Sequence, residues 1–131
     1  MQKHLLVPVD LLDLETSEKA VGNAKHIARR DGAKLSVITV IPSWPEDISR
    51  APNDYRPEFD AYLDKIREDL DVDGIFQVGG SISGRIGEAV RERDIDLVVM
   101  SSHNPRFTDY LIGSNAAHVV LHSSCSVMVV R

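Results

Sequence analysis

The sequence predicts an α/β protein built on one five-stranded, parallel, doubly wound sheet with helices on both faces. Short apolar runs alternate with segments of helical periodicity along all 131 residues. The apolar runs are continuous rather than interrupted by polar residues, as expected of strands that are buried on both faces. A predicted helix separates each strand from the next, which implies right-handed crossover connections between parallel strands.

The first three elements are a strand, a helix and a strand. Residues 5–9 form a short apolar run that an acid ends, which is typical of a buried strand. Residues 15–30 repeat alanine and isoleucine at helical spacing, and an Asp-Gly pair follows as a stop signal. Residues 35–41 are again apolar and rich in β-branched side chains, and a proline ends this second strand.

The middle of the chain begins with a proline-rich segment. Four prolines between residues 42 and 57 predict a loop or a lid rather than a regular element. Apolar side chains fall on one face over residues 58–70 and predict a second helix. Residues 75–78 predict a short strand that a Gly-Gly pair ends, and residues 83–93 predict a third helix.

The last third of the chain completes the alternation. It predicts a strand over residues 97–100, a small polar loop, a helix over residues 114–122 and a final strand over residues 126–130. We expect one domain, residues 1–131, because the length suits a single core and no linker, repeat or low-complexity tract interrupts it.

Composition argues against several classes of partner. Hydrophobic residues make up 43% of the chain and charged residues 27%, as in an ordinary soluble globular protein. The formal net charge is −5 without a basic run, so we expect neither sequence-independent nucleic-acid binding nor docking on anionic lipid. No apolar stretch approaches the roughly 20 residues of a membrane span, and the first apolar run is too short for a secretory signal. Cys125 is the only cysteine, which excludes an internal disulfide and favours the cytoplasm.

The strongest sign of a ligand is Gly113-Ser114 at the predicted start of the last helix. This pair presents free backbone N–H groups and a hydroxyl at the positive end of a helix dipole, which suits a phosphate. Asn115 adds another N–H and a side-chain amide. The structural alternative is that Ser114 only caps the helix, although the groups that form a cap also form an anion site.

The predicted topology brings a second set of residues toward that point. Ligands of a doubly wound sheet bind beyond the carboxyl ends of the strands, where the strand order reverses. If the first and fourth strands are neighbours there, Asp10 and the loop Ser101–Asn104 face each other across the crevice.

Several motifs resemble those of one protein family. They are Leu6-Val7-Pro8-Val9-Asp10, Thr39-Val40-Ile41-Pro42 and the dense stretch from Asp96 to Arg131. The last stretch contains Ser-His-x-Pro at residues 102–105 and Gly-Ser-Asn-Ala-Ala at residues 113–117. On these motifs the chain resembles the universal stress protein family along essentially its whole length, and above all its small bacterial members.

The resemblance implies a Rossmann-like or flavodoxin-like α/β sandwich of the adenine nucleotide-binding type. It also implies a homodimer and, in one branch of the family, bound ATP. The expected function is that of a nucleotide-binding universal stress protein, a dimeric regulator in stress response and signalling. Its ligand would be ATP, or AMP or ADP, with Mg²⁺ held through the phosphates, and its protein partner is unknown.

The chain departs from the pattern of the ATP-binding branch. That pattern is Gly-x-x-Gly, a spacer of nine residues, and then Gly-Ser or Gly-Thr. Here Ser101 and Asn104 stand where the two glycines would be, and eight residues separate Asn104 from Gly113. Both replacements are small, and asparagine tolerates left-handed backbone angles, so the backbone can still approach a phosphate closely.

The resemblance assigns roles to the residues of the site. Asp10 would accept from the ribose hydroxyls or the adenine, or lie near a metal on the phosphates; alternatively it caps nearby N–H groups. Val40 would meet the adenine edge through its backbone, and Met100 would touch the base or sugar or belong to the core. His103 would donate to a phosphate oxygen, and Arg106 would reach the outer phosphate or remain a solvated loop residue. No catalytic residue is predicted, and the predicted cofactor-binding residues are Pro8, Val9, Asp10, Val40, Met100, Ser101, Ser102, His103, Asn104, Arg106, Gly113, Ser114 and Asn115.

Two further features have more than one interpretation. His118 and His122 lie four residues apart with Cys125 three further on, which is a spacing typical of metal ligands. No fourth ligand is evident, and the resembling proteins use this region for packing, so no metal-ligating residue is predicted. Cys125 is expected to be a buried small hydrophobe. Trp44 either covers the base as a lid or packs on the sheet edge.

The final strand predicts self-association. Val127–Val130 would form an apolar sheet edge, which invites pairing, and the resembling proteins pair this strand with its twin in a homodimer.

Two alternative functions stay open. One is a nucleotide-free dimeric adaptor of the same fold. The other is a slow ATPase or self-phosphorylating protein, although no P-loop lysine, base or arginine finger is clearly set for it.

Overall fold

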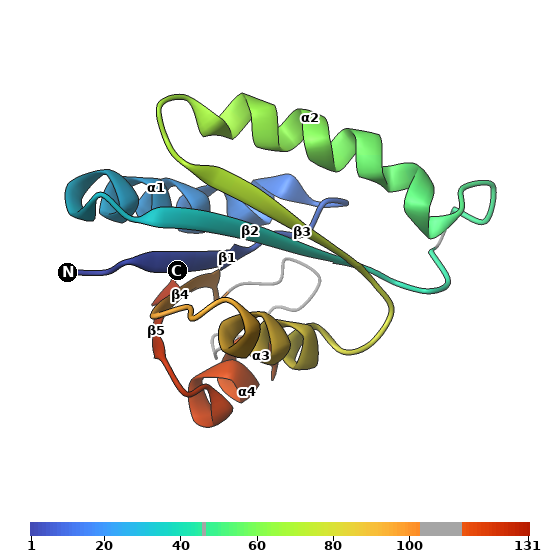
Figure 1. The fold of residues 1–131 in the computed structure, drawn as a ribbon. Helices are drawn as coiled ribbons and strands as arrows, with labels where there is room; N and C mark the ends of the chain where they lie inside the picture. Colours follow the sequence, from blue (N-terminus) through green and yellow to red (C-terminus); the bar gives the residue numbers. More distant parts are fainter. Residues whose placement is uncertain (46, 103–113) are drawn as a thin grey trace.

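The computed structural model describes residues 1–45, 47–102 and 114–131 of the chain (Figure 1). Its strands are β1 (His4–Pro8), β2 (Lys34–Ile41), β3 (Val72–Val78), β4 (Leu97–Ser101) and β5 (Ser126–Val130). Its helices are α1 (Glu18–Asp31), α2 (Arg56–Arg67), α3 (Ile82–Glu92) and α4 (Ser114–His122), with short 3₁₀ helices at Leu14–Ser17 and Pro52–Tyr55.

The strands form one parallel sheet in the order β3-β2-β1-β4-β5. Figure 1 shows α1 and α2 on one face of this sheet and α3 and α4 on the other. This arrangement confirms the predicted fold class, including the position of β5 at an edge. None of the helices over the described residues has the length and apolarity that a membrane span requires.

Two elements, β3 and α2, begin two or more residues earlier than the sequence predicted. The strand expected over residues 75–78 begins at Val72, where its pairing with β2 also begins. The apolar criterion missed this part because Asp73 and Gly74 interrupt the run. Gly74 is required by packing, since Leu63 and Phe59 of α2 occupy the space that a Cβ would take.

The helix expected over residues 58–70 spans Arg56–Arg67 instead. Pro57 is compatible with the first turn, where its missing N–H leaves no hydrogen bond unmade. The proline-rich segment before it is therefore shorter than predicted and contains a 3₁₀ helix. The helix expected over residues 15–30 likewise divides into a 3₁₀ turn and α1.

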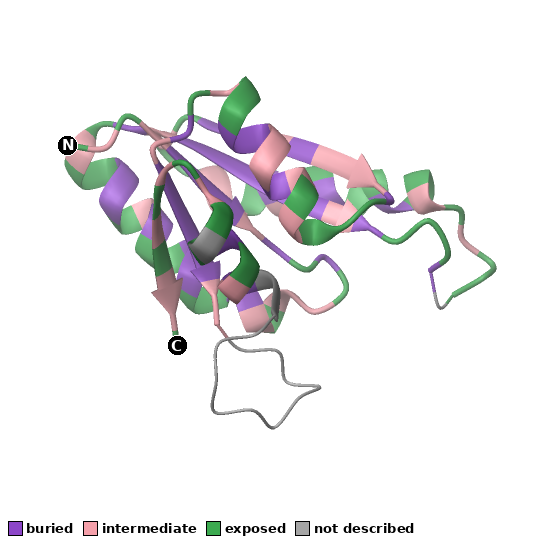
Figure 2. Cartoon of the chain, turned by 90° about the horizontal axis from the view of Figure 1, so that it is seen from below, coloured by how far each residue is buried: buried purple, intermediate pink, exposed green. Residues whose placement is uncertain are grey.

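The core has two layers, one on each side of the sheet. Figure 2 shows that the strands between them are largely buried. Leu5 and Val7 of β1 pack beneath α1 and α2, whereas Leu6 lies between them in sequence and packs toward α3 and α4. All three are 0% exposed, as the continuous apolar run predicted. Burial of each such side chain contributes about 1.5–3 kcal/mol to folding.

A tight turn at the end of α2 holds a glutamate in a conformation that favours glycine. Glu68 has φ 49° and ψ −118°, and the Leu70 N–H donates to the Arg67 carbonyl at 2.9 Å. These features define a type II′ turn, whose first central position is normally glycine. Lys25 and Arg29 of α1 contact the Glu68 carboxylate at 2.8 and 2.5 Å, so the strained residue also ties the turn to α1.

We expect Glu68→Gly to raise the free energy of unfolding, because relief of the backbone strain outweighs the loss of exposed ion pairs. The gain should exceed that of Asp94→Gly, at φ 52°, which we expect to be about 0.5–1 kcal/mol because aspartate tolerates the left-handed region. Urea unfolding at pH 7 measures both. Glu68→Gln, which removes the charge and keeps the strain, should give no gain; a gain there would show that the charge, not the backbone, limits stability.

The end of α1 carries a carboxylate that anchors the segment before β1. Asp31 accepts from the Arg30 Nε and the Gln2 N–H, each at 2.8 Å. The Arg30 side chain first, and then the Gln2 N–H, lower the pKa of Asp31 from 3.8 to about 2. Because the folded-state pKa lies below the unfolded one, this carboxylate stabilises the fold above about pH 4, and the contribution disappears as the pH falls toward 2.

Asp31→Asn should therefore lower the urea midpoint at pH 7, and the difference from the original chain should shrink between pH 4 and pH 2. Unfolding curves across this pH range check the prediction. Asp60→Asn, at an exposed carboxylate on α2, is the control and should shift the midpoint little. Equal midpoints of Asp31→Asn and the original chain at pH 7 would contradict the anchoring role.

Candidate functional site

The strand order reverses between β1 and β4. From β1 the chain proceeds outward through β2 to β3, and then crosses to the other side of β1 to form β4 and β5. This confirms the neighbourhood of the first and fourth strands that the sequence analysis inferred. In a doubly wound sheet the carboxyl edge at such a reversal is where ligands bind.

The two central strands part before they reach that edge. The paired register between β1 and β4 ends at Leu6 and Val98. In contrast, β1 stays paired with β2 as far as Pro8, and β4 stays paired with β5 as far as Ser101. The carboxyl ends of β1 and β4 therefore belong to two separate ladders, and the residues that follow them lie on either side of the point of separation.

The start of α4 lies toward the same edge. Because β4 and β5 are parallel, α4 has to return the chain from the carboxyl edge to the amino edge. Its first turn begins at Ser114, as predicted, and the N–H groups of a first helical turn have no partner within the helix. The structure describes the backbone here, whereas the side chains of Ser114 and Asn115 lie outside the description.

Asp10 follows β1 at this edge and is exposed. Its Oδ1 accepts from the Leu12 N–H at 3.0 Å, and its carbonyl accepts from the Asp13 N–H at 3.0 Å. Its own N–H lies 3.3 Å from the Ser17 hydroxyl, to which it donates. Asp10 therefore caps a local N–H group, as the structural alternative in the sequence analysis expected. A carboxylate has about four acceptor sites, so this cap leaves acceptor capacity at an exposed position.

The remaining described candidates differ in what they can offer. Met100 is 5% exposed and belongs to the core cluster under α3 and α4, with Val40 packed against that cluster. Val9 is also buried, and its N–H donates to the Ile38 carbonyl of β2. Any contact of these residues with a ligand would therefore come from the backbone or from the ends of side chains.

Ser101 ends β4 at the same edge, and Ser102 follows it. Ser101 is half-buried, and the Ser102 N–H donates to the Val130 carbonyl of β5 at 2.9 Å. Four predicted residues, His103, Asn104, Arg106 and Gly113, lie outside the described residues. Their roles stay predictions from the sequence.

Trp44 does not pack on the sheet edge. Its side chain is 89% exposed, and the nearby Ile48 is 94% exposed. The interpretation that Trp44 packs on the sheet edge is therefore wrong, and the other interpretation, a cover over a bound base, stays a prediction.

Cys125 is only half-buried, contrary to the expectation of a buried thiol, and its sulfur lies 3.3 Å from the Ser123 hydroxyl.

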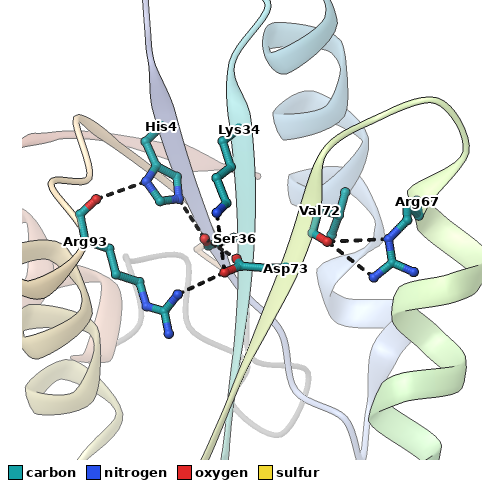
Figure 3. A network of polar contacts seen from close by, with 7 residues as sticks. All are labelled: His4, Lys34, Ser36, Arg67, Val72, Asp73 and Arg93. Carbon is teal, nitrogen blue, oxygen red and sulfur yellow. Dashed lines mark hydrogen bonds and ion pairs between the residues drawn. The ribbon is translucent and has the colours of Figure 1, made fainter.

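A second polar cluster, which the sequence analysis missed, lies at the amino edge of the sheet (Figure 3). His4 bridges the Arg93 carbonyl, 3.0 Å from Nδ1, and the Ser36 hydroxyl, 2.7 Å from Nε2. The Ser36 hydroxyl donates to the Asp73 carboxylate at 2.6 Å. Arg93 and Lys34 contact the other carboxylate oxygen at 2.9 and 3.8 Å. These residues are scattered in sequence, and only the parallel register brings them together.

A serine, a histidine and an aspartate in contact raise the question of a catalytic triad, but this set does not have the geometry of one. Ser36 is 0% exposed, so no substrate reaches its hydroxyl. The hydroxyl donates directly to the carboxylate, whereas a triad places the histidine between the nucleophile and the acid. The cluster instead links β1, β2, β3 and the end of α3 at the edge opposite the candidate site.

Comparison with known proteins agrees with this architecture. A family model described as the universal stress protein family matches residues 1–131. Universal stress protein G of Salmonella typhimurium is 31% identical over 143 aligned residues that cover 100% of both chains. The universal stress protein UspA from Lactobacillus plantarum has a similar structure, with a TM-score of 0.81 at 20% identity over 99% of this chain and 98% of that one.

A further similar structure is the universal stress protein from Archaeoglobus fulgidus in complex with dAMP. Its TM-score is 0.75 at 20% identity, and the match covers 98% of each chain. At such identities the likeness of the structures concerns the fold. The family model and the relative that is 31% identical cover the chain from end to end and establish its kinship. The chain belongs to the universal stress protein family.

Proposed function

We propose that this protein binds an adenine nucleotide, ATP or its relatives AMP and ADP, and acts as a dimeric regulator of the stress response in the cytoplasm. The observation that supports this most is the separation of β1 and β4 at the reversal of strand order. An exposed carboxylate, Asp10, follows one of these strands, and the first turn of α4 lies toward the same edge. The complex of a structural neighbour with dAMP supports an adenine nucleotide as the ligand class.

In this proposal, the backbone carries most of the phosphate binding. The N–H groups of the first turn of α4 would face the phosphates, aided by the helix dipole, and the loop Ser101–Asn104 would lie near them. Asp10 would accept from the ribose or the base. The exposed Asp10 carboxylate also fits Mg²⁺, which prefers one or two carboxylates together with phosphate oxygens, and the ion would neutralise phosphate charge.

The regulatory part of the proposal rests on the edge strand. β5 lies at the edge of the sheet, with Val127 and Val129 half-buried and Met128 37% exposed. An apolar edge strand offers unpaired backbone groups to another strand, and a second copy of β5 would satisfy them. We propose that the homodimer forms through Val127–Val130 and presents the nucleotide state to a protein partner.

Asp10→Asn should weaken ATP binding about tenfold, because it replaces a charged acceptor, whose hydrogen bond is worth about 1.5–3 kcal/mol, by a neutral one, whose hydrogen bond is worth about 0.5–1.5 kcal/mol. Isothermal titration calorimetry measures the affinity, and the fluorescence of Trp44, the one tryptophan, reports binding independently. Glu15→Gln is the matched control, because it removes an exposed charge from the 3₁₀ helix that follows the Asp10 loop. Affinity unchanged by Asp10→Asn would contradict the role of this carboxylate.

The same titration tests the proposed function itself. The original chain should give heat with ATP, ADP or AMP, and freshly purified protein should release an adenine nucleotide on denaturation. If neither is observed, the nucleotide-free adaptor replaces the nucleotide-binding regulator. Phosphate release that survives Asp10→Ala and His103→Ala unchanged would count against a catalytic role for those residues.

Met128→Lys should convert the dimer to a monomer, because a lysine on an edge strand opposes strand pairing. Light scattering after size-exclusion chromatography measures the mass, which should fall by about half. Leu12→Lys is the matched control, since Leu12 is 48% exposed and belongs to the loop after β1 rather than to β5. A dimer that persists in Met128→Lys, or one that is lost equally in Leu12→Lys, would place the interface elsewhere.

A further inference from the structure

Two histidines lie side by side on the exposed surface of α4. His118 and His122 are one helical turn apart, and both are exposed. The centroids of their rings are 4.4 Å apart, with 42° between the ring planes. Residues four apart share one face of a helix, so the pair is held by the helix itself.

This separation suits two nitrogen ligands of one metal ion. A metal–nitrogen bond of about 2.0–2.1 Å places the centre of each imidazole about 3.2 Å from the ion. Two rings bound at about a right angle then have centres about 4.5 Å apart. The observed 4.4 Å is close to this value before any ion is added. The separation of the two ring centres therefore already suits one shared ion.

The position along α4 also favours a cation. His122 is the last residue of the helix, where the carbonyl ends give the dipole its negative pole. The Ser123 N–H closes onto the Val119 carbonyl at 2.8 Å, so the turn that carries both histidines is fully wound. A cation bound at this end would be stabilised by the helix itself.

We propose that His118 and His122 form a two-nitrogen binding site for a divalent transition-metal ion, with water in the remaining coordination positions. Imidazole is a ligand for nickel, copper and zinc, and affinities rise from nickel to copper and fall again at zinc. Over the described ranges, no three histidine, cysteine or acidic side chains gather to hold a metal, so the site is open rather than enclosed. It is separate from any Mg²⁺ on a nucleotide, since Mg²⁺ prefers oxygen ligands.

Such an ion would brace the last turn of α4, immediately before β5. This effect does not depend on the proposed nucleotide site. The original chain, without an affinity tag or nucleotide, is therefore titrated with NiCl₂ by calorimetry at pH 7.5 in a buffer that does not chelate. We expect one Ni²⁺ bound per chain, because imidazole is a ligand for nickel.

Single substitutions test the ligands. Loss of a residue that only hydrogen-bonds to a metal ligand already lowers metal affinity about 10–100-fold. His118→Ala and His122→Ala, which remove a ligand itself, should therefore each lower the Ni²⁺ affinity at least about tenfold. His26→Ala, at an exposed histidine on α1, should change nothing. Cys125→Ser should also leave the affinity intact, and a loss there would overturn the assignment of two nitrogen ligands.

A register variant, which keeps two histidines on α4 but changes their spacing, tests whether the spacing itself is required. Val120→His combined with His122→Ala keeps two histidines on α4 but turns them to different faces, since residues two apart do not meet on a helix. We expect this variant to bind Ni²⁺ as weakly as His122→Ala. The proposal is overturned if the register variant binds like the original chain, or if both alanine variants do. Circular dichroism of each variant shows whether α4 is retained.

Discussion

A short seam between β1 and β4 holds the two halves of this sheet together, and the rest of the molecule depends on it. Only Leu5 with Leu97 and Leu6 with Val98 are paired across it. At the amino end, the Asp96 carboxylate closes the seam by accepting from the backbone N–H groups of residues 3 and 4, at 2.7 and 3.2 Å. The strands are thus fastened at one edge and released at the other, where the candidate site lies.

The sequence predicted those parts of the fold that depend on neighbouring residues in the chain. Continuous apolar runs predicted both central strands, because burial on two faces leaves no place for polar alternation. The start of α4 at Ser114 was predicted correctly from its capping chemistry. Element ends were less predictable: β3 begins at Val72 because pairing with β2, not apolarity, decides it, and Glu68 ends α2 in a turn that its residue type does not favour.

The amino-edge cluster could not be predicted for a different reason. His4, Ser36, Asp73 and Arg93 come from four separate elements, and no spacing in the sequence connects them. Their contacts follow from the register between strands, which is set by packing over the whole sheet. The same holds for Asp10, whose type and position were informative but whose bonds to Leu12 and Ser17 emerge only from the folded loop.

The boundary between the two cores has a consequence for how this chain tolerates change. Leu5 and Leu6 are adjacent in sequence, yet they belong to hydrophobic clusters that the backbone of the sheet keeps apart. Substitutions that lie more than about 7–10 Å apart and share no partners have additive effects on stability. The layer beneath α1 and α2 can therefore be repacked over generations without retuning the layer beneath α3 and α4, and damage on one side is not amplified by damage on the other.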